Sequence, residues 1–302
     1  MGHSVQSQIL YGVTGTTFEL GRVLGAGGMG QVYLAQQRIN DQGQCSEQLV
    51  ALKILQPGAP QQARRLFYHE GTLLPRLQHD NIVRCIERGR GAVPGLGSVD
   101  YLALAFIGGE SAGTLLQHYQ SPLPPETVLG IVAQIAAALN YIHQRGIVHC
   151  DLKPSNIMLE RSMPRAVLID FGIARAPDFV GQPVAVGTPQ YMAPEQADVQ
   201  APCDGRADLY ALGVVTYELL TGRRLFPYRT TTDVQRGKLI APHIRDLAGA
   251  VDMSVARVLA RCLQRTPDER YRTVDAMLND LRLALAGCTI EQPCSAPFPS
   301  VP

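Results

Sequence analysis

The stretch that decides the fold reads His149-Cys150-Asp151-Leu152-Lys153-Pro154-Ser155-Asn156, and a shorter run, Asp170-Phe171-Gly172, follows it. Both runs contain carboxylate or amide oxygens, which are the hard ligands that Mg²⁺ prefers. A lysine between Asp151 and Asn156 adds a positive charge suited to a phosphate group. Aspartate-containing turns are also common on protein surfaces. The ordered arrangement of the two runs nevertheless favours a site for phosphoryl transfer.

Both runs resemble the catalytic loop and the metal-binding triplet of the protein kinase family, in its eukaryotic-type (Hanks-type) serine/threonine branch. The resemblance implies that Asp151 orients the acceptor hydroxyl and receives its proton, and that Lys153 neutralises the transferring phosphate. It also implies that Asn156 and Asp170 bind Mg²⁺ or Mn²⁺. One position departs from the usual family pattern, because Cys150 stands where most members carry arginine.

A glycine-rich segment, Leu24-Gly25-Ala26-Gly27-Gly28-Met29-Gly30, lies upstream and leads into the strand-like Gln31-Val32-Tyr33-Leu34-Ala35. The dinucleotide-binding fingerprint has similar glycine spacing, but a helix follows it. A P-loop is excluded, because no GxxxxGK[ST] is present in this segment. We therefore expect a strand-turn-strand flap over nucleotide phosphates, with Leu24, Gly25, Gly27, Gly28 and Gly30 as its binding residues.

A lysine on the next strand, Lys53 in Val50-Ala51-Leu52-Lys53-Ile54-Leu55, fits the same pattern. The resemblance implies that Lys53 holds the α and β phosphates of ATP and that a carboxylate fixes its direction. Glu70 is the candidate, because it lies on the apolar face of a helix predicted from about Ala63 to Leu77. A lone helical glutamate would ordinarily be a solvated charge, and its position one helix after Lys53 argues against that interpretation.

An adenine pocket is implied by the resemblance alone. Val32 and Ala51 would form its roof and Met158 its floor, with Leu104 as gatekeeper before a hinge at Gly108-Gly109. Ala105 and Ile107 would present backbone groups to the adenine edge, and Glu110 would reach the ribose. The alternative for Glu110 is the ordinary preference of an acidic residue for a helix start.

The segment Gly187-Thr188-Pro189-Gln190-Tyr191-Met192-Ala193-Pro194-Glu195 resembles the end of a kinase activation segment. The resemblance implies that Thr188 binds near the catalytic aspartate, that Glu195 pairs with Arg270, and that Asp208 anchors the catalytic loop. No serine, threonine or tyrosine lies between Gly172 and Gly187. Because cysteine also lacks the charge that an activation-loop phosphate compensates, we predict activity without activation-loop phosphorylation.

The predicted fold is α+β and kinase-like, with two lobes of opposite character. Strand-like runs dominate residues 18–107, the N-lobe, and helical periodicity dominates residues 108–287, the C-lobe. Residues 1–17 are predicted to be a flexible lead-in and residues 288–302 a proline-rich tail. With 302 residues and 46% hydrophobic content, the chain can bury two modest cores.

Composition narrows the class of protein. A formal net charge of +1 with 18% charged residues gives no argument for nucleic acid or an acidic membrane surface. Seven cysteines without a CxxC pair predict a reduced, cytoplasmic protein. No segment reads as a run of the roughly 20 apolar residues that a membrane span requires, and the N-terminus does not resemble a signal peptide.

The sequence therefore predicts an ATP- and Mg²⁺-dependent serine/threonine protein kinase, with Gly-Gly-Met-Gly in the flap most similar to bacterial members. A pseudokinase, acting as a nucleotide-binding interaction module, is the alternative. Retention of Lys53, Asp151, Asn156 and Asp170 argues against it. Phosphorylation of a small molecule is a third possibility, disfavoured by the intact segment from Thr188 to Glu195.

Overall fold

The computed structural model describes residues 8–12, 15–27, 30–41, 44–95, 97–119, 121–177, 187–198, 202–226, 230–235 and 249–287. The chain divides into two compact units. The first comprises residues 1–78 and 83–107, and the second comprises residues 79–82 and 108–302. The predicted proline-rich tail, 288–302, lies outside the described residues.

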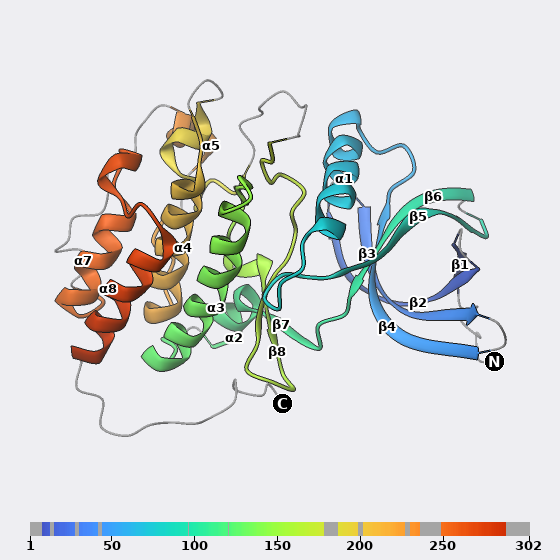
Figure 1. The fold of residues 1–302 in the computed structure, drawn as a ribbon, viewed down its shortest axis with the longest axis horizontal. Coiled ribbons are helices and arrows are strands. Elements are labelled where there is room, and N and C mark those ends of the chain that lie inside the picture. The colour runs from blue at the N-terminus through green and yellow to red at the C-terminus, as the bar shows by residue number, and fades with distance from the viewer. Residues whose placement is uncertain are drawn as a thin grey trace. The chain divides into compact units, whose positions relative to one another are not determined.

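The first unit is a closed antiparallel barrel with strand order β1-β2-β3-β4-β6-β5 (Figure 1). Its strands are β1 (Gln8–Tyr11), β2 (Thr16–Gly27), β3 (Gly30–Asp41), β4 (Gln44–Leu55), β5 (Cys85–Val93) and β6 (Gly97–Ala105). Long hairpin pairings join β2 to β3 and β3 to β4, so the chain folds mostly against its sequence neighbours. This arrangement brings the glycine-rich segment and Lys53 onto adjacent strands.

Strand β1 closes the barrel, which corrects the prediction of a flexible lead-in for residues 8–12 and 15–17; the rest of that predicted segment, 1–7 and 13–14, lies outside the described residues. β1 pairs with β2 along its whole length, and Tyr11 pairs with Ala92 of β5. Leu10 is fully buried. A strand of four residues with one inward-facing side chain is too short for its alternation to be detected in the sequence. Burial of Leu10 accounts for its place in the barrel.

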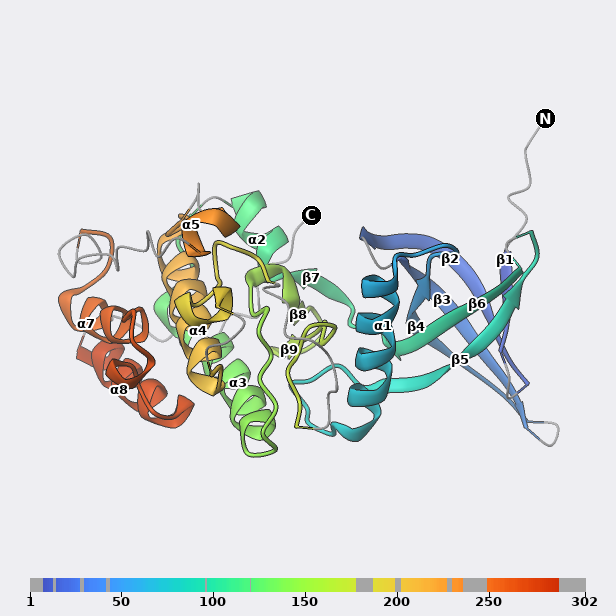
Figure 2. The ribbon, with the colours of Figure 1, turned by 90° about the horizontal axis from the view of Figure 1, so that it is seen from above.

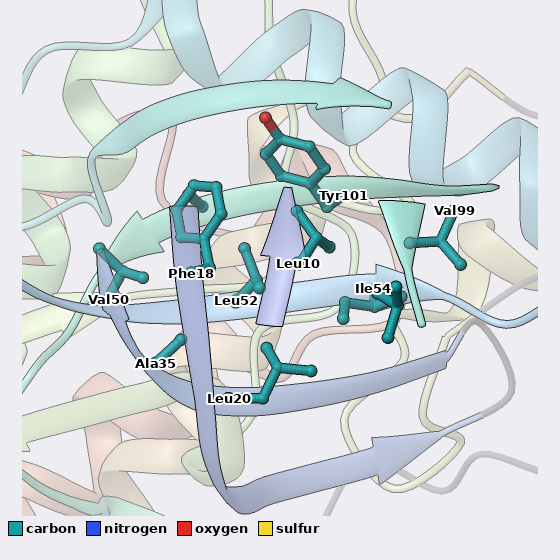
Figure 3. Close-up of a cluster of buried hydrophobic side chains, with 11 residues drawn as sticks. Leu10, Phe18, Leu20, Ala35, Val50, Leu52, Ile54, Val99 and Tyr101 are labelled. Atoms are coloured by element: carbon teal, nitrogen blue, oxygen red, sulfur yellow. The ribbon is translucent and has the colours of Figure 1, made fainter. Parts of the chain in front are cut away.

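The core of the barrel is a cluster of inward-facing side chains from its strands, among which Phe18 and Tyr101 pack edge to face with ring centroids 5.2 Å apart (Figure 3). Burial of this apolar surface is the main force that closes the barrel. The other members are Leu10, Leu20, Ala35, Val50, Leu52, Ile54, Val93, Val99 and Ala103.

Helix α1 (Gln61–Leu73) packs on the barrel and carries Glu70. The sequence predicted this helix to continue to Leu77. It ends earlier, and a short 3-10 turn follows at Leu74–Arg76, because proline at position 75 has no backbone N–H to continue the α-helical hydrogen bonding. A Cβ at Gly71 would lie 2.8 Å from Leu102 Cδ2. The close approach of α1 to β6 therefore requires glycine at this point.

The second unit is mainly helical and contains a small sheet of order β7-β8-β9. The strands are β7 (Gly109–Ser111), β8 (Ile157–Glu160) and β9 (Ala166–Leu168), and the helices are α2 (Ala112–Tyr119), α3 (Pro125–His143), α4 (Gly205–Thr221), α5 (Thr231–Gln235), α7 (Met253–Cys262) and α8 (Val274–Gly287). α3 packs against α4 and α8, and α7 packs against the same two helices (Figures 1 and 2).

Two helices of this unit position the predicted catalytic loop. α3 begins with Pro125 in its first turn and leads into Gly146, which has a φ of +69°. Only glycine adopts this backbone conformation readily, so the chain turns here toward His149. α4 is buried along almost its whole length; Asp204 caps its N-terminus and Gly222, at a φ of +66°, ends it.

Among the described residues, α3 is the one helix that meets length and hydropathy criteria for crossing a membrane, with 19 residues and a mean hydropathy of 1.2. Those criteria concern length and composition alone. Its apolar face packs against α4, α8 and β9, and its buried residues include Val132, Ile135 and Leu139. This packing is that of a core helix, and a buried core helix can meet the same length and hydropathy criteria as a membrane span.

Candidate active site

The backbone of Cys150 is held from both sides. Its amide N donates to Asp208 Oδ1 at 2.9 Å, and its carbonyl accepts from Gln196 Nε2 at 2.7 Å. Cys150 has a φ of +66°, a left-handed conformation that a non-glycine residue keeps only when its surroundings impose it. The loop before Asp151 is therefore set by contacts of the Cys150 backbone.

Asp208 is the anchor of this loop. Its carboxylate accepts from the backbone amide of His149 at 2.9 Å and from His143 Nε2 at 2.8 Å, in addition to the Cys150 amide. Complete burial alone would raise the pKa of Asp208, but the hydrogen bond from His143, the nearby imidazoles and the His149 amide hold that pKa below its usual value. Asp208 is thus a buried carboxylate satisfied by its donors, as buried charges require.

Asp151 lies at the centre of a compact hydrogen-bonded group. Its Oδ1 accepts from the Thr188 amide at 3.0 Å and from Thr188 Oγ1 at 2.9 Å. Its Oδ2 accepts from Lys153 Nζ at 2.7 Å and from Asn156 Nδ2 at 3.3 Å. Lys153 Nζ also donates to Thr188 Oγ1 at 2.9 Å. The structure therefore brings together Asp151, Lys153, Asn156 and Thr188, four of the residues that the sequence singled out.

Asn156 and Asp170 are joined through the backbone. The amide of Ile169 donates to the Asn156 carbonyl at 2.9 Å, which sets Asp170 beside the Asn156 turn. The Asn156 side-chain amide donates to the Asp151 carbonyl at 2.9 Å, so its Nδ2 is turned toward Asp151 and its Oδ1 away from that carbonyl.

The conformation of the Asp170-Phe171-Gly172 run is set by burial of its central residue. Asp170 has a φ of +63°, another left-handed non-glycine residue. Phe171 is fully buried and packs edge to face on the His149 ring, with centroids 4.8 Å apart. Packing of Phe171 thus fixes the backbone on which Asp170 is carried.

Lys53 and Glu70 form an ion pair inside the first unit. Lys53 Nζ of β4 lies 2.5 Å from Glu70 Oε2 of α1. The Glu70 side chain is 1% exposed and the Lys53 side chain 14% exposed. A carboxylate this deeply buried needs its partner, because an unpaired charge in such a place is strongly destabilising. The pair directs the lysine side chain.

The glycine-rich segment forms the β2–β3 hairpin that the sequence predicted as a flap. Gly25 pairs with Val32, and Gly27 pairs with Gly30. Leu24 is half-buried, beside a register shift between Val23 and Gly25. A Cβ at Gly30 would lie 2.0 Å from the Ile54 carbonyl oxygen, so backbone packing requires glycine there. Gly28, also predicted to bind phosphate, lies outside the described residues.

The residues predicted for the adenine pocket are distributed over both units. In the first, Ala51 pairs with Leu34 on one side and with Leu104 on the other, and Val32 pairs with Lys53. The Ala105 amide donates to the Arg84 carbonyl at 2.9 Å. Ile107 is buried. In the second unit, Met158 of β8 is half-buried and pairs with Ser111 and Val167.

Glu110 lies in β7, opposite Leu159. Its Oε2 is 3.7 Å from His118 Nδ1 of α2. Ser111 Oγ accepts from the Thr114 amide at 3.0 Å and so provides the cap of α2, one residue after Glu110. The carboxylate of Glu110 is directed instead at a histidine of the same helix.

Arg270 and Glu195 form a two-pronged ion pair, with NH1–Oε1 at 2.7 Å and NH2–Oε2 at 2.8 Å. The Arg270 side chain is completely buried and also donates to the backbone carbonyls of Gln264, Arg206 and Arg265. This pair fastens the end of the segment that carries Thr188 to the helical core.

Two residues around the site were missed by the sequence reasoning. Gln196 holds the Cys150 carbonyl, and His143 donates to Asp208. Neither belongs to a run that sets it apart. The position of Gln196 directly after Glu195 is the one signal that could have drawn attention to it.

A sequence model of the family described as "Protein kinase domain" matches residues 18–281. The chain belongs to the protein kinase family. The resemblance seen in the sequence and the predicted kinase-like α+β fold are therefore confirmed.

Named relatives come from bacteria. Serine/threonine-protein kinase Pkn1 of Myxococcus xanthus is 36% identical over 294 residues, covering 92% of this chain and 39% of the relative. Serine/threonine-protein kinase PknB of Mycobacterium leprae is 35% identical, covering 93% of this chain and 44% of the relative. The chain thus spans less than half the length of these two relatives.

The structural comparison also finds kinase domains. The PknI kinase domain of Mycobacterium tuberculosis, as a C20A_R136A double mutant, superposes with a TM-score of 0.66 at 31% identity, covering 88% of this chain and 95% of that one. A second structure of the PknI kinase domain of Mycobacterium tuberculosis gives the same TM-score at 30% identity.

Proposed function

We propose that this protein is an ATP- and Mg²⁺-dependent serine/threonine protein kinase. The observation that carries the proposal is the Asp151 carboxylate, which is held by Thr188 on one oxygen and by Lys153 and Asn156 on the other. Membership of the kinase family and relatives named as serine/threonine kinases support it.

Asp151 is the group that orients the acceptor hydroxyl and takes its proton. Positioning is the main contribution that a protein makes to phosphoryl transfer, and the contacts to Thr188 fix one oxygen of the carboxylate. Lys153 Nζ, which bridges Asp151 and Thr188, supplies a positive charge for the phosphoryl oxygens. In this arrangement two neighbouring side chains act on the two reactants: Asp151 on the acceptor hydroxyl and Lys153 on the phosphoryl group.

Asn156 and Asp170 would hold Mg²⁺. Their amide and carboxylate oxygens fit that ion, which is commonly bound by one or two protein oxygens together with substrate phosphates and water. Within the described part of the chain, no three His, Cys, Asp or Glu side chains gather into a metal site, so the two-ligand arrangement accords with a metal completed by the nucleotide. Bound there, Mg²⁺ would neutralise charge on the phosphate oxygens.

Lys53 would bind the ATP phosphates while Glu70 keeps its side chain extended. The flap supports this role, because a Cβ at Gly25 or Gly27 would meet nothing within 4 Å. Packing inside the protein therefore does not require glycine at these two positions. Close approach of phosphates to the backbone would require it.

We also propose that activity does not depend on activation-loop phosphorylation. The segment between Gly172 and Gly187 has no hydroxyl side chain, although residues 178–186 of it, including Asp178, lie outside the described residues. Cys150 is uncharged and buried, so no cation at this position needs a phosphate to neutralise it. Treating the purified protein with a phosphatase should leave its rate nearly unchanged, and a tenfold loss would contradict the proposal.

The central test is transfer of labelled phosphate from ATP, with Mg²⁺, to a generic protein substrate containing serine and threonine. Wild type should transfer label, and Asp151→Asn and Lys53→Met should not. Asp268→Asn is a matched control, because this carboxylate is 87% exposed. Nucleotide binding by wild type without transfer would favour the pseudokinase. Transfer by Asp151→Asn at the wild-type rate would remove the assigned role of Asp151.

Cytoplasmic localisation is part of the proposal. The described cysteines Cys85, Cys150, Cys203 and Cys262 carry free thiols, which supports a reducing compartment. Fractionation of cells that express the protein would test the location directly.

A further inference from the structure

The side chain of Gln196 links two backbone segments of the second unit. The residue lies in the 3-10 turn Pro194–Ala197 and is 3% exposed. Its Nε2 donates to the Cys150 carbonyl at 2.7 Å, and its Oε1 accepts from the Ala193 amide at 2.9 Å. A backbone carbonyl can only accept and a backbone N–H can only donate, so these two partners fix which end of the side-chain amide faces which segment.

We propose that Gln196 is a positioning residue for phosphoryl transfer, which couples the segment of residues 187–196 to the catalytic loop. The donor at Nε2 holds the peptide between Cys150 and Asp151 in the orientation that places the Asp151 carboxylate against Thr188. The kinetic part of this inference rests on the proposed kinase function. The coupling itself concerns hydrogen bonds within one unit, and it can be measured without turnover.

The peptide that joins Cys150 to Asp151 is held at both of its polar ends. Its carbonyl oxygen accepts from Gln196, and its N–H, which belongs to Asp151, donates to His149 Nδ1 at 3.3 Å. Since a peptide unit is planar, fixing these two ends fixes the direction in which Asp151 leaves the loop. Cys150 has a φ of +66°, a conformation that persists in a non-glycine residue only when its surroundings impose it. The bond from Gln196 is one of the contacts that do so.

The coupled segment meets the catalytic loop at two separate points. At the first, the Thr188 amide and hydroxyl donate to Asp151 Oδ1 at 3.0 and 2.9 Å. At the second, Gln196 reaches the Cys150 carbonyl, and a Cβ at Gly187 would lie 3.3 Å from the same oxygen. A segment attached at two points cannot pivot about either of them, so the contact of Thr188 depends on the contact of Gln196.

The backbone of Gln196 is itself firmly held. Glu195, its neighbour in the chain, forms the two-pronged ion pair with the buried Arg270, and the Gln196 amide donates to the Ala193 carbonyl at 3.1 Å. The side chain therefore extends from a fixed turn and holds the loop, instead of following it. A reacting group keeps its geometry only when such supporting residues are fixed in turn.

A purely structural role is the alternative, in which Gln196 stabilises the fold without affecting the geometry of Asp151. Gln134 of α3 provides the comparison, because its side chain makes the same kind of bridge in the same unit. Its Nε2 donates to the Pro164 carbonyl at 2.9 Å, and its Oε1 accepts from the Ala166 amide at 2.9 Å. Neither partner belongs to the catalytic loop. If both glutamines are only structural, equivalent changes at the two positions should have equivalent effects.

The test replaces each glutamine by glutamate, which has nearly the same shape. In Gln196→Glu one carboxylate oxygen can still accept from the Ala193 amide, but the other repels the Cys150 carbonyl while the group is ionised. Labelled-phosphate transfer at about pH 8 should fall at least tenfold, with the KM for ATP changed less than twofold, because a displacement of about 1 Å can reduce a rate on the order of 100-fold. Gln134→Glu should keep the wild-type rate.

Protonation of the new carboxyl should restore the missing donor. Burial favours the neutral form of a carboxyl, and that form can donate to the Cys150 carbonyl as the amide does. The rate of Gln196→Glu divided by the wild-type rate should therefore rise severalfold as the pH falls from about 8 to about 6. The ratio removes the effect of the other charged and titratable groups around the site, which both proteins share: His149, Asp151, Lys153, Asp208, Glu195 and Arg270. A flat ratio, or a wild-type rate in Gln196→Glu, would overturn the proposal.

Amide hydrogen exchange, resolved to single residues, separates this inference from the proposed function. The Thr188 amide is bonded to Asp151, so its exchange should become at least tenfold faster in Gln196→Glu and stay unchanged in Gln134→Glu. If wild type transfers no phosphate, the proposed function fails, while the exchange rates still decide whether Gln196 couples the two segments. Unchanged exchange at Thr188 in the folded variant would refute the coupling. If Gln196→Glu does not fold, Gln196→Met, which has a similar shape and no charge, replaces it in the rate and exchange measurements.

Discussion

Removing the carboxylate of Glu195 should destabilise the second unit severely. The guanidinium of Arg270 makes five hydrogen bonds, two to Glu195 and three to backbone carbonyls. Its side chain is 0% exposed and that of Glu195 is 8% exposed. In Glu195→Ala the guanidinium would stay buried without a counter-charge, because arginine does not deprotonate in proteins.

The size of the effect follows from this burial. Breaking a buried ion pair by removal of one partner costs about 3–5 kcal/mol. For a unit of this size each kcal/mol lowers the melting temperature by about 2–4 °C, so the expected drop is about 6–20 °C. Glu195→Gln keeps an acceptor oxygen for one of the two bonds and should lose less than Glu195→Ala.

Thermal unfolding followed by circular dichroism would measure the drop. Asp268→Ala is the control, because Asp268 pairs with Arg206 but is 87% exposed, and such surface pairs contribute about 0–1 kcal/mol. The reasoning is refuted if Glu195→Ala melts within 2–3 °C, roughly 1 kcal/mol, of Asp268→Ala.

Four further predictions test the barrel, the flap and the catalytic loop. Leu10→Ala should lower the free energy of unfolding by about 2–5 kcal/mol in urea denaturation, because Leu10 is fully buried; a change below about 0.5 kcal/mol, as at an exposed site, would contradict its place in the core. Gly30→Ala should lower the melting temperature, since its Cβ would lie 2.0 Å from a carbonyl oxygen, whereas Gly130→Ala, with nothing within 4 Å, should not. Asp208 has a lowered pKa, so its charge stabilises the fold above the unfolded pKa near 3.9 and this stabilisation is lost as pH falls through the folded pKa. The gap in melting temperature between wild type and Asp208→Asn should therefore be constant from about pH 8 to 5 and narrow only below about pH 4; a gap already narrowing at pH 6 would be inconsistent with it. Thr188→Ala should lower the rate of phosphate transfer about 10- to 100-fold through loss of a hydrogen bond to a charged group, and Thr188→Ser, which keeps the hydroxyl, should retain most of it; equal losses would point to the methyl group instead.

Most of the fold and of the candidate site was predicted from short motifs and from helical periodicity. The apolar spacing around Glu70 placed it on a helix after Lys53, and the structure brings the two side chains to 2.5 Å. Helical periodicity likewise predicted a mainly helical lobe over residues 108–287. In each case the signal is local, because the neighbours that define it lie within one or two turns of the chain.

Contacts between distant loops left no such signal. β1 has four residues and a single fully buried side chain, Leu10, too few for a period. Gln196 reaches Cys150 through the tertiary fold, from a short 3-10 turn without regular spacing. Its contact joins segments 46 residues apart in the chain, so no local pattern could predict it.

Residue 150 shows how backbone and side chain can have separate roles. Its amide is bound by Asp208 and its carbonyl by Gln196, and neither contact depends on the side chain. Arginine and cysteine can therefore occupy this position with the same loop geometry, since the bonds that orient Asp151 are made by atoms common to both. The side chain decides instead whether this position carries a charge. An arginine offers a charge that a phosphate can neutralise, whereas Cys150 is uncharged and buried.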